Sequence, residues 1–233
     1  LFATSTHAAV AAANGPRIQA THSKNATGWA SSNWSGYAIT GGPFTSVTGS
    51  WVVPTVAKTR HATYSSSWAG IDGFSNSNLI QAGTEQDYYS GAAHYFAWWE
   101  ILPAAETRIS LSVKPGDQMS VSITRGSNGW TITVKDARSG SFTTVQSYSG
   151  PGTSAEWIQE APSVGGHIAT LAKYGHATFD PGTANGKSPA LVSSDGGVMV
   201  QKSVQVSTPS VPDRDFDGFN VKYGSTAPAA LSS

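Results

Sequence analysis

The chain has 233 residues, a formal net charge of +0 and only 12% charged residues. This balance offers no basic face for nucleic acid and no polybasic helix for a membrane surface, so neither is expected as a partner. The sequence contains no cysteine, which excludes disulfide bonds, a thiolate nucleophile and zinc sites built on cysteine.

Residues 1–32 contain Arg17, Lys24 and two histidines, but no acidic residue and few large apolar side chains. They cannot build a hydrophobic core. We expect either a flexible terminus or the remnant of a basic pro-segment that covers an acidic cleft. The opening LFATSTHAAVAAANG is rich in small side chains, like the end of a signal peptide. This favours a secreted, extracellular protein whose leader has been removed, and no later run of about 18 apolar residues predicts a transmembrane helix.

Residues 33–224 are expected to form one catalytic domain of short strands joined by turns. Gly 25, Pro 12 and 10% aromatic residues favour strands over long helices. We predict an all-β fold, a two-sheet antiparallel β-sandwich of the concanavalin-like or jelly-roll type with a concave substrate cleft, followed by a frayed tail over 225–233. In chain order, the expected strands are 34–39, 44–53, 63–71, 92–102, 108–113, 118–124, 130–136, 141–148, 198–206 and 219–223.

Several common catalytic motifs are absent from the sequence. There is no Gly-x-Ser-x-Gly elbow, no His-Glu-x-x-His helix and no phosphate-binding loop, so serine hydrolases, zinc peptidases and nucleotide enzymes have no support. The scattered histidines after residue 32 are expected in turns or in solvent. No metal ion and no cofactor is predicted.

One segment resembles the start of a calcium-binding loop. DRDFDG, residues 213–218, places Asp213, Asp215 and Asp217 at the offsets of such a loop. The twelfth position is Gly224 rather than Glu. The sequence therefore favours a turn that enters the last strand over a calcium site.

Four segments combine polar or acidic side chains with aromatic residues inside predicted strands. A buried Gln or Glu needs a polar partner, and such groups persist most often where function uses them. Alternate residues of a strand share a face, so these side chains are expected to line one concave sheet. The sets that share a face are Trp68, Gly70 and Asp72; Leu79 and Gln81; Trp98, Glu100 and Leu102; and Glu156, Ile158 and Glu160.

The order of these segments resembles the glutamic peptidase (eqolisin) family over about residues 33–180. The family patterns are N-W-G-G, W-x-G-I-D-G, I-L-Q-T-G, A-W-Y-E-W-Y-P and A-E-[FW]-I-x-E. The segments similar to them are, in the same order, NWSGY (33–37), WAGIDG (68–73), LIQAG (79–83), AWWEILP (97–103) and AEWIQE (155–160).

The sequence also departs from the fungal members of that family. No Cys follows I-D-G, so the chain resembles a cysteine-free branch that we expect to be bacterial. Leu102 stands where the pattern has Tyr, and Phe96 stands where it has Asp. The substrate preference of the fungal members is therefore not carried over.

The resemblance implies an acid-acting endopeptidase in which Gln81 and Glu160 form the catalytic pair. Glu160 would take a proton from water and later return it to the leaving amine, while Gln81 would hold that water and stabilise the oxyanion. Because an amide does not titrate, only the carboxylate sets the acid limit of activity. Protein or peptide substrates and a monomer are expected.

The resemblance also places four supporting residues at the cleft, namely Trp34, Trp68, Asp72 and Glu100. For the two carboxylates, the alternative is burial with turn amides as partners. For the two tryptophans, the alternative is packing in the core. The small number of carboxylates on the surface also predicts that folding stability depends weakly on acid pH.

Two other functions fit parts of the sequence. A glycoside hydrolase on a similar sandwich could use Glu100 and Glu160 as paired carboxylates, but it leaves Gln81 without a role. A carbohydrate-binding module explains the tryptophans but not the order of the motifs.

Overall fold

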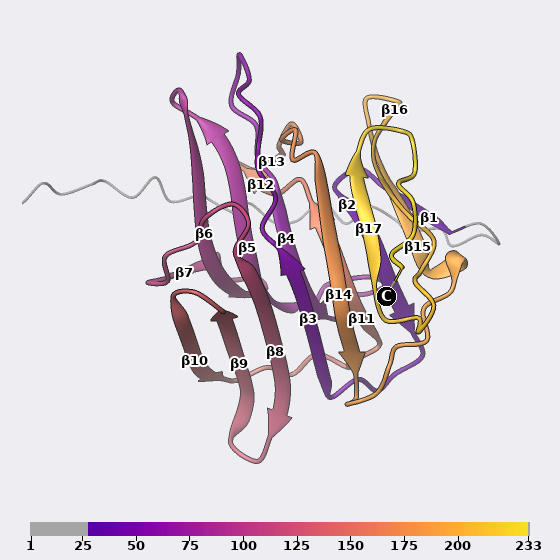
Figure 1. The fold of residues 1–233 in the computed structure, drawn as a ribbon. Coiled ribbons are helices and arrows are strands. Elements are labelled where there is room, and N and C mark those ends of the chain that lie inside the picture. Colours follow the sequence, from indigo (N-terminus) through magenta and orange to yellow (C-terminus); the bar gives the residue numbers. More distant parts are fainter. Residues whose placement is uncertain (1–27, 233) are drawn as a thin grey trace, which may run out of the picture.

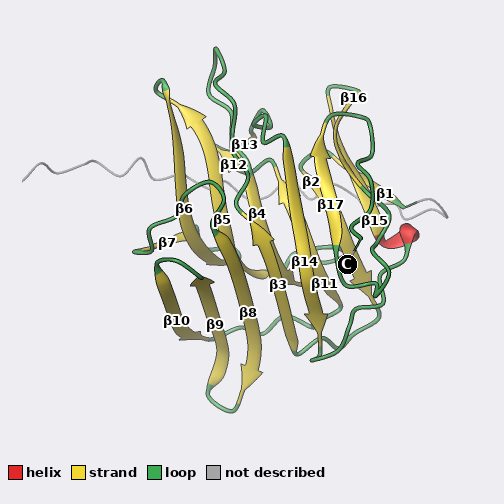
Figure 2. Ribbon diagram, viewed as in Figure 1, coloured by secondary structure: helices red, strands yellow, loops and turns green. Residues whose placement is uncertain are grey.

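The computed structural model describes residues 28–232, so residues 1–27 of the predicted N-terminal segment lie outside the described part of the chain. Nearly all of its regular structure is β-strand (Figures 1 and 2), which confirms the all-β prediction. Among these residues, no helix is long and apolar enough to cross a membrane. The elements are β1 (Trp29–Ser31), β2 (Trp34–Thr40), β3 (Ser46–Val52), β4 (Ser66–Ile71), β5 (Ile80–Tyr89), β6 (Ala92–Ile101), β7 (Thr107–Ile109), β8 (Gln118–Gly126), β9 (Gly129–Asp136), β10 (Gly140–Gln146), β11 (Ser154–Glu160), β12 (Ser163–Val164), β13 (His167–Ile168), β14 (His176–Ala184), the 3-10 turn η1 (Ser193–Asp195), β15 (Gly196–Gln201), β16 (Val204–Pro209) and β17 (Phe219–Tyr223).

Hydrogen bonds join fifteen of these strands into one large, mainly antiparallel sheet (Figure 1). The strand order is β10-β9-β8-β3-β14-β17-β16-β15-β2-β11-β4-β5-β6-β7, and β1 pairs in parallel with β15. β12 and β13 form a separate two-stranded sheet. The sequence predicts two sheets. In the structure, the pairing of β15 with β16 joins the half of the ladder from β10 to β16 with the half from β15 to β7.

The main core lies where β3 faces β5 and β11. Trp51 Nε1 on β3 donates a hydrogen bond of 3.0 Å to Thr84 Oγ1 on β5. Trp157 Nε1 on β11 donates a hydrogen bond of 2.7 Å to the carbonyl oxygen of Thr48 on β3. Both indole rings are buried, and burying a large apolar side chain stabilises the fold by about 3 kcal/mol. One face of β11, β4 and β5 therefore packs against β3, and the opposite face carries Gln81 and Glu160.

Several strands differ from the prediction. Segment 198–206, predicted as one strand, is the β15–β16 hairpin, because Lys202 and Ser203 have φ angles of 49° and 64° and form its two-residue turn. The predicted strand 108–113 is confined to β7. β14 is not among the predicted strands, since Pro181 and Gly182 interrupt its pattern where its register with β3 shifts.

Residues outside the predicted domain 33–224 also make defined contacts. β1 precedes Asn33, pairs with β15 and buries Trp29. In the predicted tail, the carbonyl oxygen of Ala229 accepts a hydrogen bond of 2.9 Å from Asn220 Nδ2. The described sheet therefore begins at Trp29.

Candidate active site

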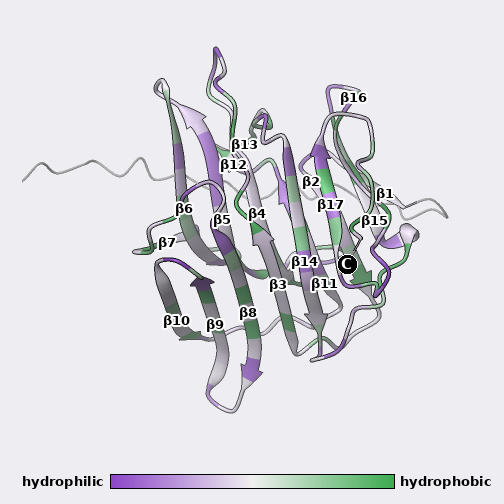
Figure 3. Cartoon of the chain, viewed as in Figure 1, coloured by the Kyte–Doolittle hydropathy of each residue, from purple (hydrophilic) through white to green (hydrophobic). Residues whose placement is uncertain are grey.

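Four adjacent strands, β11, β4, β5 and β6, carry the predicted catalytic residues on one face. Their register aligns Glu156, Gly70, Gln81 and Glu100 in a row across the sheet. Glu160 is on the same face of β11, four residues further along, so Gln81 and Glu160 lie diagonally with β4 between them. Figure 3 shows hydrophilic stretches along β5. For the residues within these strands, the register agrees with the predicted sharing of faces because the strands pair without bulges. Asp72, Leu79 and Leu102 of the predicted sets lie just outside β4, β5 and β6.

The carboxylate of Glu160 is buried and held by two donors. Glu160 is the last residue of β11, and its side chain is 2% exposed. Trp68 Nε1 donates to Oε2 at 2.7 Å, and Asn33 Nδ2 donates to Oε1 at 3.2 Å. The donors belong to β4 and to the residue before β2, so they fix the carboxylate from two elements. Two N–H donors fit an ionised carboxylate, which only accepts hydrogen bonds.

The amide of Gln81 is buried and oriented by Glu100. Gln81 is 0% exposed, and its Nε2 donates to Glu100 Oε2 on the neighbouring strand β6. Within residues 28–232, Gln81 Oε1 has no hydrogen-bond partner. A primary amide has two N–H donors and an acceptor oxygen. Glu100 therefore leaves one donor and the acceptor of Gln81 for a bound molecule.

A small pocket brings Glu100 and Glu160 together. Carboxylates predominate in its lining, which consists of Glu85, Trp98, Glu100, Glu106, Glu160, Pro162 and Ser163. In the described part of the chain, no hydrogen bond joins Gln81 directly to Glu160. Gln81 is thus connected to this acidic pocket through its bond to Glu100.

Burial and like charges raise the pKa values of the acids around the pocket. The pKa of Glu106 is raised to about 7, first by burial and then by neighbouring carboxylates. Burial, with Asp87 and Glu106 as the next causes, raises the pKa of Glu85 well above its ordinary value. Burial raises the pKa of Asp87 to about 7, although Arg108 acts in the opposite direction. Burial also raises the pKa of Glu156 well above its ordinary value, so these groups favour the neutral form.

Trp34 and Trp68 pack against each other beside this pocket. Their rings meet edge to face, with centroids 5.0 Å apart and an interplanar angle of 77°. Both are buried in an apolar cluster that includes Trp98 and Ile158. The packing alternative therefore describes both rings, and Trp68 has in addition its hydrogen bond to Glu160.

Asp72 lies just beyond β4 and directs its carboxylate to the loop 148–153. Its backbone has a φ angle of 71°, so the alternation of the strand ends there. This environment is the predicted alternative of a buried carboxylate satisfied largely by turn amides. The donors are Asn76 Nδ2 at 2.8 Å, the hydroxyl of Tyr148 at 2.7 Å, and the backbone N–H groups of Gly152 at 2.9 Å and Thr153 at 2.8 Å.

Four residues of this region were missed by the sequence analysis: Asn33, Glu85, Asp87 and Glu106. Glu85 and Asp87 share a face of β5 with Gln81, so extending the alternation along that strand identifies them. Glu106 lies in the loop between β6 and β7, where no periodic pattern applies. Asn33 belongs to a quoted motif, but only its contact with the carboxylate of Glu160 reveals its position in the site.

Comparisons with known proteins match the chain to one family and to several solved structures. Residues 32–223 match the Peptidase A4 family. Aspergillopepsin-2 from Aspergillus niger is 30% identical, over 75% of this chain and 74% of that protein. The structure of aspergilloglutamic peptidase from Aspergillus niger has a TM-score of 0.57 and 27% identity, and covers 69% of this chain and 99% of that one. The structure of scytalido-glutamic peptidase with a transition state analog inhibitor has a TM-score of 0.69 and 22% identity, covers 82% of this chain and 98% of that one, and shows the same fold.

Proposed function

The chain belongs to the peptidase A4 family, the glutamic peptidases or eqolisins, and is a glutamic endopeptidase, and from this premise we propose that Gln81 and Glu160 form its catalytic pair. The proposed reaction is hydrolysis of peptide bonds in protein or peptide substrates under acid conditions. One observation carries this proposal: the buried Glu160 carboxylate, oriented by Trp68 and Asn33, lines the same pocket as the partner of Gln81, Glu100.

Glu160 would act as the general base and then as the general acid. As a carboxylate it removes a proton from the attacking water, and once protonated it gives that proton to the nitrogen of the leaving amine. The bonds from Trp68 and Asn33 hold the two oxygens in place, so little reorientation is needed between the two steps. Positioning of this kind lowers the activation barrier, because the groups are already ordered before the reaction begins.

Gln81 would hold the water and stabilise the oxyanion. Its Oε1 can accept a hydrogen bond from the water, while the N–H that Glu100 does not use can donate to the developing negative charge. Glu100 is proposed as a positioning residue, because it fixes which way the amide faces. An amide keeps this role at every pH, so titration affects only the carboxyl partners.

The acidic pocket is suited to acid conditions. At about pH 4, acids with pKa values near 7, such as Glu106 and Asp87, are almost entirely protonated and add no repulsion. In that form a carboxyl group can donate a hydrogen bond to a substrate carbonyl. At neutral pH the same groups ionise beside Glu100 and Glu160, and the pocket becomes strongly repulsive. We propose that activity falls as pH rises for this reason.

The substrate cleft is proposed to lie over the polar face of β11, β4, β5 and β6, with the two halves of the ladder acting as the layers of a β-sandwich. Trp68 would support catalysis by orienting Glu160, and Trp34 would support Trp68 by packing against it. Asp72 would fix the loop 148–153 at the border of this cleft.

Residues 1–32 are proposed to include a basic pro-segment of a secreted, monomeric zymogen, and residues 225–233 to follow the catalytic domain 33–224 as a tail. Arg17 and Lys24 would be attracted to the acidic pocket at neutral pH and released when acid protonates it. A shortened chain that begins at Gly28, which keeps β1, should be active at once in acid, whereas the full chain should show a lag. If the full chain is active without a lag while residues 1–27 are still attached, the proposal of a pro-segment is wrong.

The experiment that tests the proposed function compares two substrates. The chain is incubated with denatured protein and with a β-glucan at about pH 3 and at about pH 7. Peptide products from the protein at the lower pH, with an intact glucan, are the expected result. Release of sugars from the glucan would instead favour a glycoside hydrolase, and binding of glucan without any cleavage would favour a carbohydrate-binding module.

A further inference from the structure

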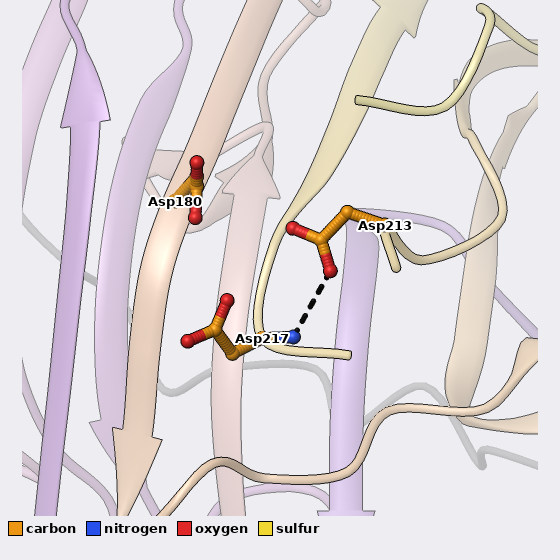
Figure 4. A group of neighbouring side chains, drawn as sticks. All are labelled: Asp180, Asp213 and Asp217. Atoms are coloured by element: carbon orange, nitrogen blue, oxygen red, sulfur yellow. Dashed lines mark hydrogen bonds between the residues drawn. The ribbon is translucent and has the colours of Figure 1, made fainter. Parts of the chain in front are cut away.

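A second group of carboxylates lies outside the pocket, where the loop between β16 and β17 meets β14. Asp180 belongs to β14, and Asp213 and Asp217 belong to the loop (Figure 4). One oxygen from each carboxylate lies within 4.8 Å of the others. The loop is tied to the strand here, because the N–H of Gly182 donates to the carbonyl oxygen of Asp217 at 2.9 Å.

Asp213 supplies a buried oxygen that has no partner. The residue is 4% exposed, and its Oδ1 accepts a hydrogen bond of 3.1 Å from the N–H of Asp217. Within residues 28–232, no donor reaches its Oδ2, which Figure 4 shows directed toward Asp180 and Asp217. A buried polar atom without a partner destabilises the fold, and a charged one does so more strongly. The arrangement therefore calls for a positive partner between the carboxylates.

Gly218 keeps the space beside these oxygens free of side-chain atoms. A Cβ atom at this position would lie 2.3 Å from Asp213 Oδ2 and 2.9 Å from Asp180 Oδ1. The backbone of Gly218 does not have the positive φ angle that requires glycine. Glycine is required at position 218 because a side chain would occupy the space next to the carboxylates, and even the methyl group of alanine would fill it.

Three acidic side chains meet here, and the basic residue of the same loop, Arg214, is exposed. No lysine or arginine of the described residues forms an ion pair with Asp180, Asp213 or Asp217. Within residues 28–232, no basic side chain therefore neutralises these three carboxylates through a direct ion pair.

We propose that Asp180, Asp213 and Asp217 bind a calcium ion. Carboxylate oxygens without any histidine or cysteine favour a hard cation over zinc or copper. The three oxygens lie within 4.8 Å of one another, so one ion can contact all of them. A site with several protein carboxylates favours calcium, because magnesium usually keeps several waters and binds through only one or two carboxylates. The ion would supply the partner that Asp213 Oδ2 lacks among the described residues.

This site differs from the calcium loop weighed in the sequence. In that pattern all ligands come from DRDFDG and the segment after it, and Gly224 fails at the twelfth position. In the structure, Asp180 contributes from β14 instead, and Asp215 is exposed rather than part of the group. The ion would fasten the loop to β14 beside the point where the register of β14 with β3 shifts.

The test measures calcium binding and thermal stability of the full chain at about pH 7, because metal affinity falls when ligands are protonated. Isothermal titration with calcium chloride should show one site. At about 100 times the dissociation constant, calcium should raise the Tm by about 5–10 °C relative to the same protein in EDTA. Magnesium chloride should produce a smaller shift.

Three variants make the result specific. Asp213→Asn keeps the size of the side chain and its Oδ1 acceptor, and Gly218→Ala keeps every charge, yet both should abolish the calcium-dependent rise in Tm. Asp215→Asn is the matched control, because it removes a nearby exposed charge and should keep most of the rise. The comparison uses the difference with and without calcium, so a change in baseline stability does not affect it. Absence of calcium binding by the wild type, or an equal rise in Asp213→Asn, would overturn the site.

Discussion

Two groups of carboxylates in this molecule experience opposite environments. Where β8 begins and β9 ends, Arg138 donates from Nε to Asp117 Oδ1 at 2.8 Å and from Nη2 to Asp117 Oδ2 at 2.6 Å. The hydrogen bond from Arg138 is the largest cause that lowers the pKa of Asp117. In the pocket, burial is the largest cause, and it raises the pKa values of Glu85 and Glu106.

The difference shows how the same side chain can favour neutral or acid conditions. The guanidinium of Arg138 bonds Asp117 directly and outweighs the desolvation of that carboxylate, whereas a buried carboxyl among other acids is most stable when it is protonated. The surface composition predicts a weak effect of acid pH on stability. The buried acids correct this expectation, because they make the folded chain favour acid.

The largest expected effect comes from the catalytic pair. Gln81→Ala and Glu160→Ala should each lower kcat/KM by about 10³-fold or more, since each removes a group used in the transition state. Cleavage of casein at about pH 4 measures the loss, and near-UV circular dichroism verifies the fold. A folded variant with nearly wild-type activity would remove that residue from the mechanism.

A smaller loss is expected when the donor to Glu160 is removed. Trp68→Phe keeps an aromatic ring but deletes the N–H that binds Oε2, so kcat should fall about 10- to 100-fold, with little change in KM. Trp157→Phe is the matched control, because this indole is buried on the opposite face and bonds to Thr48. If both variants lose activity equally, the hydrogen bond to Glu160 has no special role.

Stability should rise as the pH falls from about 7 to about 4. A carboxyl with a higher pKa in the folded chain binds its proton more tightly there, so its stabilising effect is complete below the unfolded pKa and lost as pH rises through the folded pKa. For Asp87 and Glu106, the folded pKa is about 7, so the Tm in EDTA should be about 5–10 °C higher at the lower pH. A Tm that falls on acidification would contradict the raised pKa values of these buried acids.

The smallest effect is expected at the surface pair, and its sign is opposite. The pKa of Asp117 is lowered, so its contribution is present above the unfolded pKa and disappears as pH falls through the folded pKa. Arg138→Ala should therefore reduce the Tm slightly at about pH 7 and leave it unchanged in strong acid, with normal proteolysis. If Arg138→Ala lowers the Tm more in acid than at about pH 7, the Arg138–Asp117 pair is not the cause of the lost stability.

The sequence predicts the fold best where strand patterns are regular. The predicted segments around Gln81 and Glu100 overlap β5 and β6, and the register of these strands agrees with the sharing of faces inferred from alternation. The prediction fails at Lys202 and Ser203, because their turn lacks the Asn-Gly signal that usually marks such hairpins. It also fails at Pro181, since a strand that contains a bulge does not show a continuous pattern.

The surroundings of the candidate site were less accessible to sequence reasoning. Alternation along a strand cannot reveal a loop residue such as Glu106, whose position depends on how β6 and β7 connect. It also cannot show that Asp180 approaches Asp213 and Asp217, which follow it by more than thirty positions in the chain. Such groups are created by tertiary contacts, and residue types alone do not indicate them.

The most direct test of the proposed pair is a double-mutant cycle at about pH 4 with Gln81→Ala, Glu160→Ala and the variant that carries both changes. When two residues act as one catalytic unit, substituting either one already removes nearly all of their joint contribution to kcat/KM. We therefore expect kcat/KM of the double variant to lie within about tenfold of the slower single variant. If the two losses multiply, so that the double variant falls by the product of the single effects, Gln81 and Glu160 act independently and the account of a catalytic pair is wrong.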